Sequence, residues 1–147
     1  GSLIIFGALD VSDARRAVEV TLAELDRTFG DVYANDAGHL EFQYTARASY
    51  ALNKAFGAPL GKAFGITVGA PAAIGVVLAD TAVKASTIDV IGYASPAAGT
   101  SYSNEVISFF SGDSGAVRQA IIAAREVGRG LLGALGAYPE SVTTPYI

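Results

Sequence analysis

The sequence predicts an α/β domain, because apolar stretches of strand length alternate with longer stretches that have one apolar face at helical spacing. Of the 147 residues, 51% are hydrophobic and 16% are charged, a composition typical of a globular domain that buries more than one side, as in a packed assembly. A chain of this length forms one domain, or one and a fraction. A short internal repeat accounts for the fraction.

The first half of the chain is expected to contain two strands and two helices. Residues 2–7 are apolar and predict a strand, and residues 10–29 follow as an amphipathic helix that a glycine ends. Residues 33–38 are expected to form a loop. Leu40–Ala46 alternates apolar and polar side chains, which predicts a half-buried strand. Residues 47–56 then predict a short helix that glycine and proline end.

The second half is expected to supply three strands and two helices. Residues 63–70 form a continuous apolar run, which predicts a buried strand, and a proline opens the helix 71–85 after it. Residues 88–94 and 105–111 predict strands, separated by a stretch of small polar residues. The helix 114–132 follows, with glycines beyond its end, and the last ten residues hold two prolines and predict an extended tail.

Composition and charge exclude several classes of function. The net charge is −4, and the ten Lys and Arg residues are scattered, which argues against a nucleic-acid partner or a polybasic membrane patch. The longest stretch without charge, residues 63–79, is shorter than the roughly 20 residues of a membrane span and contains a proline. The chain has no cysteine, hence no disulfide and no thiolate site, and a cytoplasmic setting fits.

Two segments of the sequence resemble each other at an offset of 103 residues. IIFGALDVSDARRAV aligns with ISFFSGDSGAVRQAI, and both predict a strand, an aspartate-led turn and a helix. We therefore expect a tandem repeat of about 100 residues, of which the chain holds the end of one copy and all of the next. Asp10 and Asp113 precede the matching helices, where a carboxylate accepts hydrogen bonds from free N–H groups. The identical residues are Ile4, Phe6, Asp10, Arg15 and Ala17 in one copy and Ile107, Phe109, Asp113, Arg118 and Ala120 in the other.

The letters GDSG around Ser114 also surround the nucleophile of chymotrypsin-like serine proteases. That chemistry needs a histidine base and a carboxylate that orients it, and the only histidine is His39, in an expected loop. The aligned copy has Val11 in place of Ser114, so the serine is not part of the repeated pattern. We therefore predict a turn that starts a helix, with a serine hydrolase using Ser114 as the lesser alternative.

Two further groups of side chains suggest chemistry less strongly. His39 with Asp36 and Glu41 has the ligand types of a metal site, but a lone histidine in a polar loop is usually just exposed. Asp80 and Lys84 stand four residues apart on an expected helix, which favours a surface ion pair over an acid–base couple. The sequence therefore predicts no metal site, no catalytic residue and no cofactor.

Residues 63–132 resemble a known family. AAIGVVLADTAVKASTIDVIGY, a loop of small residues and then ISFFSGDSGAVRQAIIAA follow the order of the bacterial microcompartment shell domain. This resemblance implies an α+β sandwich with a mostly antiparallel sheet flanked by helices. The strand LEFQYTARAS precedes this core, whereas the simplest shell proteins place it after the core, which implies a circularly permuted domain.

The rest of the chain resembles one subfamily, the tandem-domain shell proteins of propanediol- and ethanol-utilisation compartments. The stretch LDRTFGDVYANDAGHLEFQYTARASYALNKAFGAP and the tail TTPYI carry this likeness, which points to their C-terminal part. The implied organisation is the end of a first repeat over residues 1–33, a complete permuted domain over residues 34–138 and an extended tail over residues 139–147.

The resemblance implies a structural function rather than an enzyme, located in the shell of a bacterial microcompartment. Tandem members form trimers that imitate hexagons, tile edge to edge with other shell proteins, and leave pores for small metabolites. Carried over by position, Lys84 corresponds to a lysine at the tile edge, and Arg47 to an arginine that meets such edges. The pore-loop position holds Ser95, Pro96, Ala97, Ala98, Gly99, Thr100 and Ser101.

Simpler interpretations stay open beside these. In them Lys84 forms only a surface pair with Asp80, Arg47 only begins a helix, and the loop only joins two strands. A small-molecule-binding regulatory α/β domain is the alternative to a shell tile. It predicts a ligand pocket between subunits and no flat arrays, whereas a tile predicts large flat assemblies and no active site.

Overall fold

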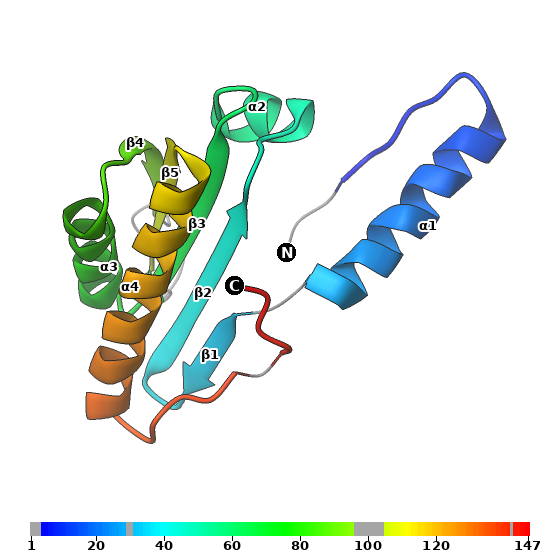
Figure 1. Ribbon diagram of the computed structural model, residues 1–147. Coiled ribbons are helices and arrows are strands. Elements are labelled where there is room, and N and C mark those ends of the chain that lie inside the picture. The colour runs from blue at the N-terminus through cyan, green and yellow to red at the C-terminus, as the bar shows by residue number, and fades with distance from the viewer. Residues whose placement is uncertain (1–3, 29–30, 96–104, 142) are drawn as a thin grey trace.

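In the computed structural model, which describes residues 4–28, 31–95, 105–141 and 143–147, a five-stranded antiparallel sheet forms the centre of the molecule (Figure 1). Its strand order is β1-β2-β3-β5-β4, and every neighbouring pair is antiparallel. This confirms the predicted fold class. The strands are β1 (Val32–Asn35), β2 (Gly38–Thr45), β3 (Ala63–Ala70), β4 (Asp89–Ala94) and β5 (Val106–Gly112), and the helices are α1 (Val11–Thr28), α2 (Tyr50–Phe56), α3 (Ala72–Ala85) and α4 (Ser114–Ala134).

Three predictions about local structure were wrong. Residues 33–38 are not a loop, because Val32–Asn35 pairs with β2 in a tight hairpin. Of the strand expected over residues 2–7, residues 4–7 form no strand, since no strand in the described part of the chain pairs with them, and residues 2–3 lie outside the described residues. The helix expected over 47–56 begins at Tyr50, where Ser49 caps it by accepting a hydrogen bond from the Leu52 N–H.

One face of the sheet carries the main core, and α3 and α4 lie side by side across it (Figure 1). Leu40 and Phe42 on β2 and Phe110 on β5 point towards Leu78 on α3 and Ile121 on α4, and all five side chains are buried. Burial of each such side chain stabilises the fold by about 1.5–3 kcal/mol. This core fixes both helices and therefore fixes which of their faces remain outside.

Glycines let the helices approach the sheet closely. A Cβ on Gly69 of β3 would lie 2.6 Å from both Cα and N of Gly75 on α3, a separation that real Cβ atoms essentially never show. A Cβ on Gly128 of α4 would lie 2.7 Å from Cδ2 of Leu78, so α4 also packs on α3 through a glycine. A larger residue at position 69 would have to move the backbone of α3, whereas one at position 128 would have to displace the end of the Leu78 side chain.

The opposite face of the sheet carries a smaller aromatic cluster below α2. Phe64 on β3 and Phe109 on β5 point away from α4, and Phe56 at the end of α2 covers them. The ring centroids of Phe56 lie 5.4 Å from Phe64 and 5.0 Å from Phe109. Gly57 ends α2 with φ of 68°, a left-handed conformation that suits glycine.

The N-terminal segment and α1 form a separate unit beside the sheet (Figure 1). Helix α1 runs back along residues 4–7, and a groove of about 230 Å³, lined mostly by apolar side chains, lies between the two segments. Leu22 and Leu25 remain 58% and 48% exposed there, so this unit buries little of its apolar face. The domain boundary expected between residues 33 and 34 stays a prediction. The first strand of the sheet, β1, begins at Val32. The groove is lined by Ile4, Phe6, Val18, Thr21, Leu22 and Leu25.

We expect Gly69→Ala to lower the free energy of unfolding by about 1–3 kcal/mol, because its methyl group must displace the backbone of α3 at Gly75. Chemical denaturation monitored by circular dichroism measures the change. Gly115→Ala in α4 is the matched control, because a Cβ there meets nothing within 4 Å, and it should leave stability unchanged or raise it by up to about 1 kcal/mol. Equal stability of the two variants would contradict the close packing of α3 on β3.

Candidate functional site

Lys84 stands in the last turn of α3 and points to solvent. Its Nζ lies 2.5 Å from Oδ2 of Asp80, four residues earlier, and the two side chains are 72% and 56% exposed. The structure therefore forms the surface pair that the spacing predicts. An exposed pair of this kind stabilises a helix by only about 0.3–0.5 kcal/mol.

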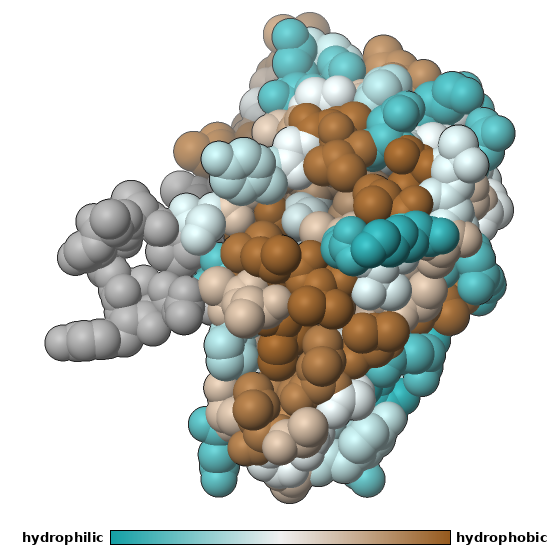
Figure 2. All heavy atoms as spheres, turned by 90° about the vertical axis from the view of Figure 1, so that its left-hand side faces the viewer, coloured by the Kyte–Doolittle hydropathy of each residue, from teal (hydrophilic) through white to brown (hydrophobic). Residues whose placement is uncertain are grey.

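The face around Lys84 is otherwise largely apolar. Val76, Val77 and Val83 on the outer side of α3 are 59%, 39% and 39% exposed, and Val90 on β4 is 54% exposed. Figure 2 shows a broad hydrophobic band on the side of the molecule where α3 and β4 lie, crossed by a few hydrophilic side chains. A continuous apolar surface of this kind is typical of a protein–protein contact.

Arg47 lies in the connection between β2 and α2 rather than at the start of a helix, so the interpretation of Arg47 as a helix start was wrong. Its side chain is exposed, and its carbonyl accepts a 3.4 Å hydrogen bond from Oγ1 of Thr45. The sheet register aligns the end of β2 with the start of β4 through β3 and β5. Arg47 follows β2 and Lys84 precedes β4, so both lie near the same end of the sheet.

Ser95 marks the start of the predicted pore loop, directly after β4. Its Oγ donates a 2.9 Å hydrogen bond to the carbonyl of Glu105, immediately before β5, so the two ends of the loop are tied together. The remaining predicted loop residues, Pro96, Ala97, Ala98, Gly99, Thr100 and Ser101, lie outside the described residues.

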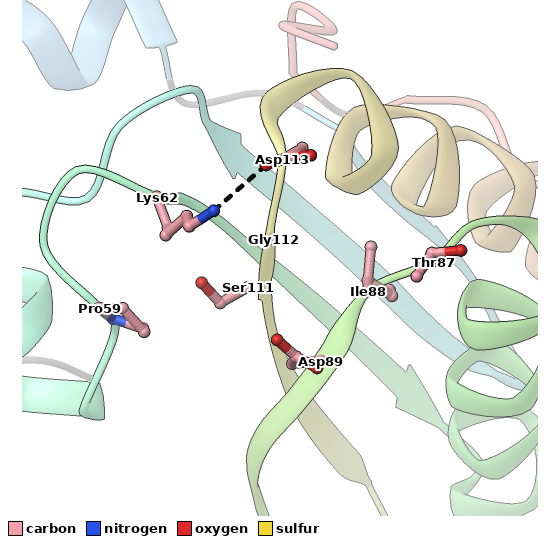
Figure 3. A pocket seen from close by; sticks show the side chains of 8 residues that line it. All are labelled: Pro59, Lys62, Thr87, Ile88, Asp89, Ser111, Gly112 and Asp113. Carbon is pink, nitrogen blue, oxygen red and sulfur yellow. Dashed lines mark hydrogen bonds and ion pairs between the residues drawn. The ribbon is translucent and has the colours of Figure 1, made fainter.

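A shallow hollow of about 290 Å³ lies where β5 turns into α4 (Figure 3). Figure 3 shows Lys62 reaching across it to Asp113, with 3.3 Å between Nζ and Oδ1. Asp113 is the N-cap residue of α4, but its side chain accepts no hydrogen bond from the helix. The predicted carboxylate cap was therefore wrong in this detail, and the Asp113 carboxylate pairs with Lys62 instead. At Asp10 the backbone carbonyl accepts the Ala14 N–H at 3.2 Å as α1 begins.

Ser114 has a structural partner rather than a catalytic one. Its Oγ lies 2.5 Å from the phenolic oxygen of Tyr44 on β2. His39 is five residues from Tyr44 on the same strand, so the two side chains point to opposite faces of the sheet about 17 Å apart along it. His39 instead faces two carboxylates, with Nε2 3.3 Å from Glu105 and 3.8 Å from Glu41. Ser114 thus lacks the base that a hydrolase needs.

The structure also does not support a metal site at His39, Asp36 and Glu41. Among the described residues, no group of three or more potential ligands is placed to hold a metal ion. Within the same residues, no helix combines the length and the apolar character that crossing a membrane requires.

One buried polar cluster, centred on Asp31, was not identified from the sequence. The Asp31 carboxylate is fully buried and accepts hydrogen bonds from Arg125 Nη1 at 2.7 Å and from Tyr33 at 3.1 Å. Its other oxygen accepts the backbone N–H groups of Tyr146 and Ile147, both at 2.8 Å. No local pattern joins residues 94 and 115 positions apart, and the one signal was an acidic residue in an expected loop.

The environment of this cluster shifts the pKa of two groups. Burial would by itself lower the pKa of Arg125, but the hydrogen bond and the negative charge of Asp31 outweigh it and raise that pKa. Burial raises the pKa of the Tyr33 hydroxyl, and the Asp31 charge adds to the effect. Arg125 therefore stays charged and the Tyr33 hydroxyl stays neutral at physiological pH.

Comparison with known proteins gives the class first. Residues 63–138 match the model of the BMC domain, and the chain belongs to this family. Within it, the chain is 65% identical over all 147 residues to the bacterial microcompartment shell protein PduB of Citrobacter freundii, and 51% identical to PduB of Limosilactobacillus reuteri (strain DSM 20016). It spans 54% and 62% of those two proteins, so it corresponds to only part of their length.

Solved structures show the same relation. The crystal structure of a trimeric shell protein PduB matches 96% of this chain and 62% of its own, with a TM-score of 0.88 at 50% identity. The structure of EtuB from Clostridium kluyveri matches 95% of this chain and 62% of its own, with a TM-score of 0.86 at 52% identity. EutL from Clostridium perfringens, at 21% identity, shares the fold with a TM-score of 0.70.

We expect Ser114→Ala to cost no more than about 1 kcal/mol of stability, because it removes one exposed hydrogen bond to Tyr44. A serine-directed fluorophosphonate should label neither the parent chain nor the purified variant above a heat-denatured control. Labelling of the parent that Ser114→Ala abolishes would mean that the serine is a nucleophile after all.

Proposed function

We propose that this chain is part of a structural shell protein that packs edge to edge into the wall of a bacterial microcompartment in the cytoplasm. The observation that carries the proposal is the full-length match, at 65% identity, to a protein described as a bacterial microcompartment shell protein. The BMC domain match over residues 63–138 supports it independently. In this function the protein acts through packing contacts at its outer surfaces rather than through a catalytic cleft.

The surface supports a packing function. The apolar band on α3 and β4 is the kind of surface that another protein covers (Figure 2). The core behind it is rigid, because α3 lies against β3 through two glycines. We infer that copies of the protein contact one another through this side and that such contacts build a trimer, the state named for one solved PduB structure.

The predicted edge residues suit contacts between neighbouring tiles. Lys84 has a long side chain at the C-terminal end of α3, where the helix dipole favours a cation and where carbonyl groups of a facing helix can accept its hydrogens. We propose that Lys84 bridges the joint between tiles. Arg47, exposed near the same end of the sheet, is proposed to meet such an edge from the other side.

We further propose that the segment from Ser95 to Ser101 lines a pore for small metabolites. The support is its position between β4 and β5 and the hydrogen bond from Ser95 to Glu105 that closes its base. A hydrolase is not proposed, since Ser114 bonds Tyr44 and has no histidine beside it in the described structure. No observation favours a ligand-sensing domain.

We expect the purified chain to self-associate through lateral contacts. Analytical ultracentrifugation should show the sedimenting mass increase with concentration, because contact between apolar bands removes valine side chains from water. Negative-stain electron microscopy of concentrated samples should show flat assemblies. A stable monomer at every concentration would contradict the packing function for this part of the protein.

We expect Lys84→Ala to reduce the number and size of sheets while the thermal midpoint of the isolated oligomer changes little. Loss of the exposed pair with Asp80 removes at most about 0.5 kcal/mol from the fold, whereas a loss at the joint is repeated at every contact of a sheet. Asp80→Ala is the matched control, because it removes the same ion pair and keeps the ammonium. If both variants form normal sheets, or if both lose sheets to the same extent, Lys84 does not bridge the joint between tiles.

A further inference from the structure

Strand β1 lies at one edge of the sheet, with β2 as its neighbour on one side only. The Asp31 carbonyl, directly before β1, accepts the Phe42 N–H of β2 at 3.1 Å. Because hydrogen-bonded pairs alternate along an antiparallel ladder, Tyr33 also bonds β2, whereas the N–H and C=O groups of Val32 and Ala34 point outward. Outward groups of this kind are a template on which a strand of another chain can pair.

The chain that follows α4 runs past this edge (Figure 1). Ser141 forms an antiparallel bridge with Tyr33, so residues 137–141, here called the cover segment, lie along β1. The antiparallel register sets Glu140 opposite Ala34 and brings the segment next to the outward backbone groups. One bridge by itself holds a segment weakly, so the side chains around it determine whether it stays in place.

Asn35, the last residue of β1, anchors the start of the cover segment. Its side-chain amide donates a 3.0 Å hydrogen bond to the Leu132 carbonyl at the end of α4 and a 2.8 Å bond to the Ala137 carbonyl. Pro139, in the middle of the segment, is fully buried. The fixed φ of a proline reduces the conformational freedom that the chain loses when it is held in this place.

Arg129 on α4 supplies a further anchor. Its guanidinium lies 4.9 Å from the ring centroid of Tyr33 on β1 and 4.9 Å from that of Tyr138 in the cover segment. One cation therefore contacts an aromatic ring on each side of the covered edge. Gly133 lets the segment fold back closely on α4, because a Cβ there would lie only 3.0 Å from Cδ2 of Tyr138.

The two edges of the sheet differ. Strand β4, at the other edge, has a register shift between Val90 and Gly92. Such an irregularity interrupts the row of backbone groups and makes an edge a poor template for another strand. Strand β1 is in regular register with β2 over all four of its residues. Its protection therefore depends on the cover segment.

We propose that the cover segment is a built-in block, which occupies the outer edge of β1 and prevents this strand from pairing with a strand of a second copy of the chain. While the anchors hold, the outward groups of Val32 and Ala34 are covered. When the segment is released, β1 becomes a pairing site. This inference concerns the fold of a single chain and does not depend on the proposed shell function.

The test is the double variant Tyr138→Ala with Pro139→Gly, which removes the ring beside Arg129 and the buried proline. Its far-UV circular dichroism should stay that of the parent. In hydrogen exchange followed by NMR, the Ala34 amide should exchange at least about tenfold faster than in the parent. The Tyr33 amide points to β2 and should keep the rate of the parent. Thioflavin T fluorescence should rise on incubation as released β1 strands pair.

Glu140→Ala is the matched control, because Glu140 is an exposed residue of the same segment and the anchors at Asn35, Pro139 and Arg129 remain. It should behave as the parent in both measurements. Should the double variant lose its circular dichroism signal, Tyr138→Ala alone decides, since it changes only a side chain that is 58% exposed.

Three results would overturn the proposal. An Ala34 amide that exchanges at the rate of the parent would show that the segment does not cover β1. Faster exchange at Ala34 without a rise in thioflavin T fluorescence would show that the cover does not block strand pairing. Equal effects in Glu140→Ala would show that the anchors are not what holds the segment in place.

Discussion

The buried ion pair between Asp31 and Arg125 links three segments that are far apart in the sequence. These segments are the residue directly before β1, the middle of α4 and the last two residues of the chain. A buried carboxylate is tolerated only when its partners are complete, because a single missing donor leaves a desolvated charge. The cluster therefore specifies one arrangement of these segments, in addition to any net stability that it contributes.

Packing of the helices imposes a second constraint, which acts on the outer surface. Glycines at positions 69, 75 and 128 let α3 pack closely against the sheet and α4 pack closely against α3. Val76 and Val83 lie on the outer side of α3, the side that this packing leaves exposed. They form part of the apolar band.

Polar residues that look catalytic in the sequence have ordinary partners in the structure. Ser114 bonds Tyr44, Asp113 pairs with Lys62, and His39 faces two glutamates. The partners of Ser114 and Asp113 come from a strand and a connection far away in the sequence, which is why letters such as GDSG could not identify them. Local spacing did predict the pair between Asp80 and Lys84, because residues four apart on a helix are neighbours whatever the fold.

The sequence by itself determined the elements whose signals are local. The apolar run at residues 63–70, the helix after Pro71 and the glycine end of α2 all lie where periodicity and turn residues predict them, and the family motifs implied the antiparallel sheet. Tertiary structure alone decided that β1 is a strand, that residues 4–7 are not, and that Asp31 is buried against Arg125 and the tail. The reason is physical, because a strand exists only beside a partner and a buried charge only beside its donors, and both partners lie elsewhere in the chain.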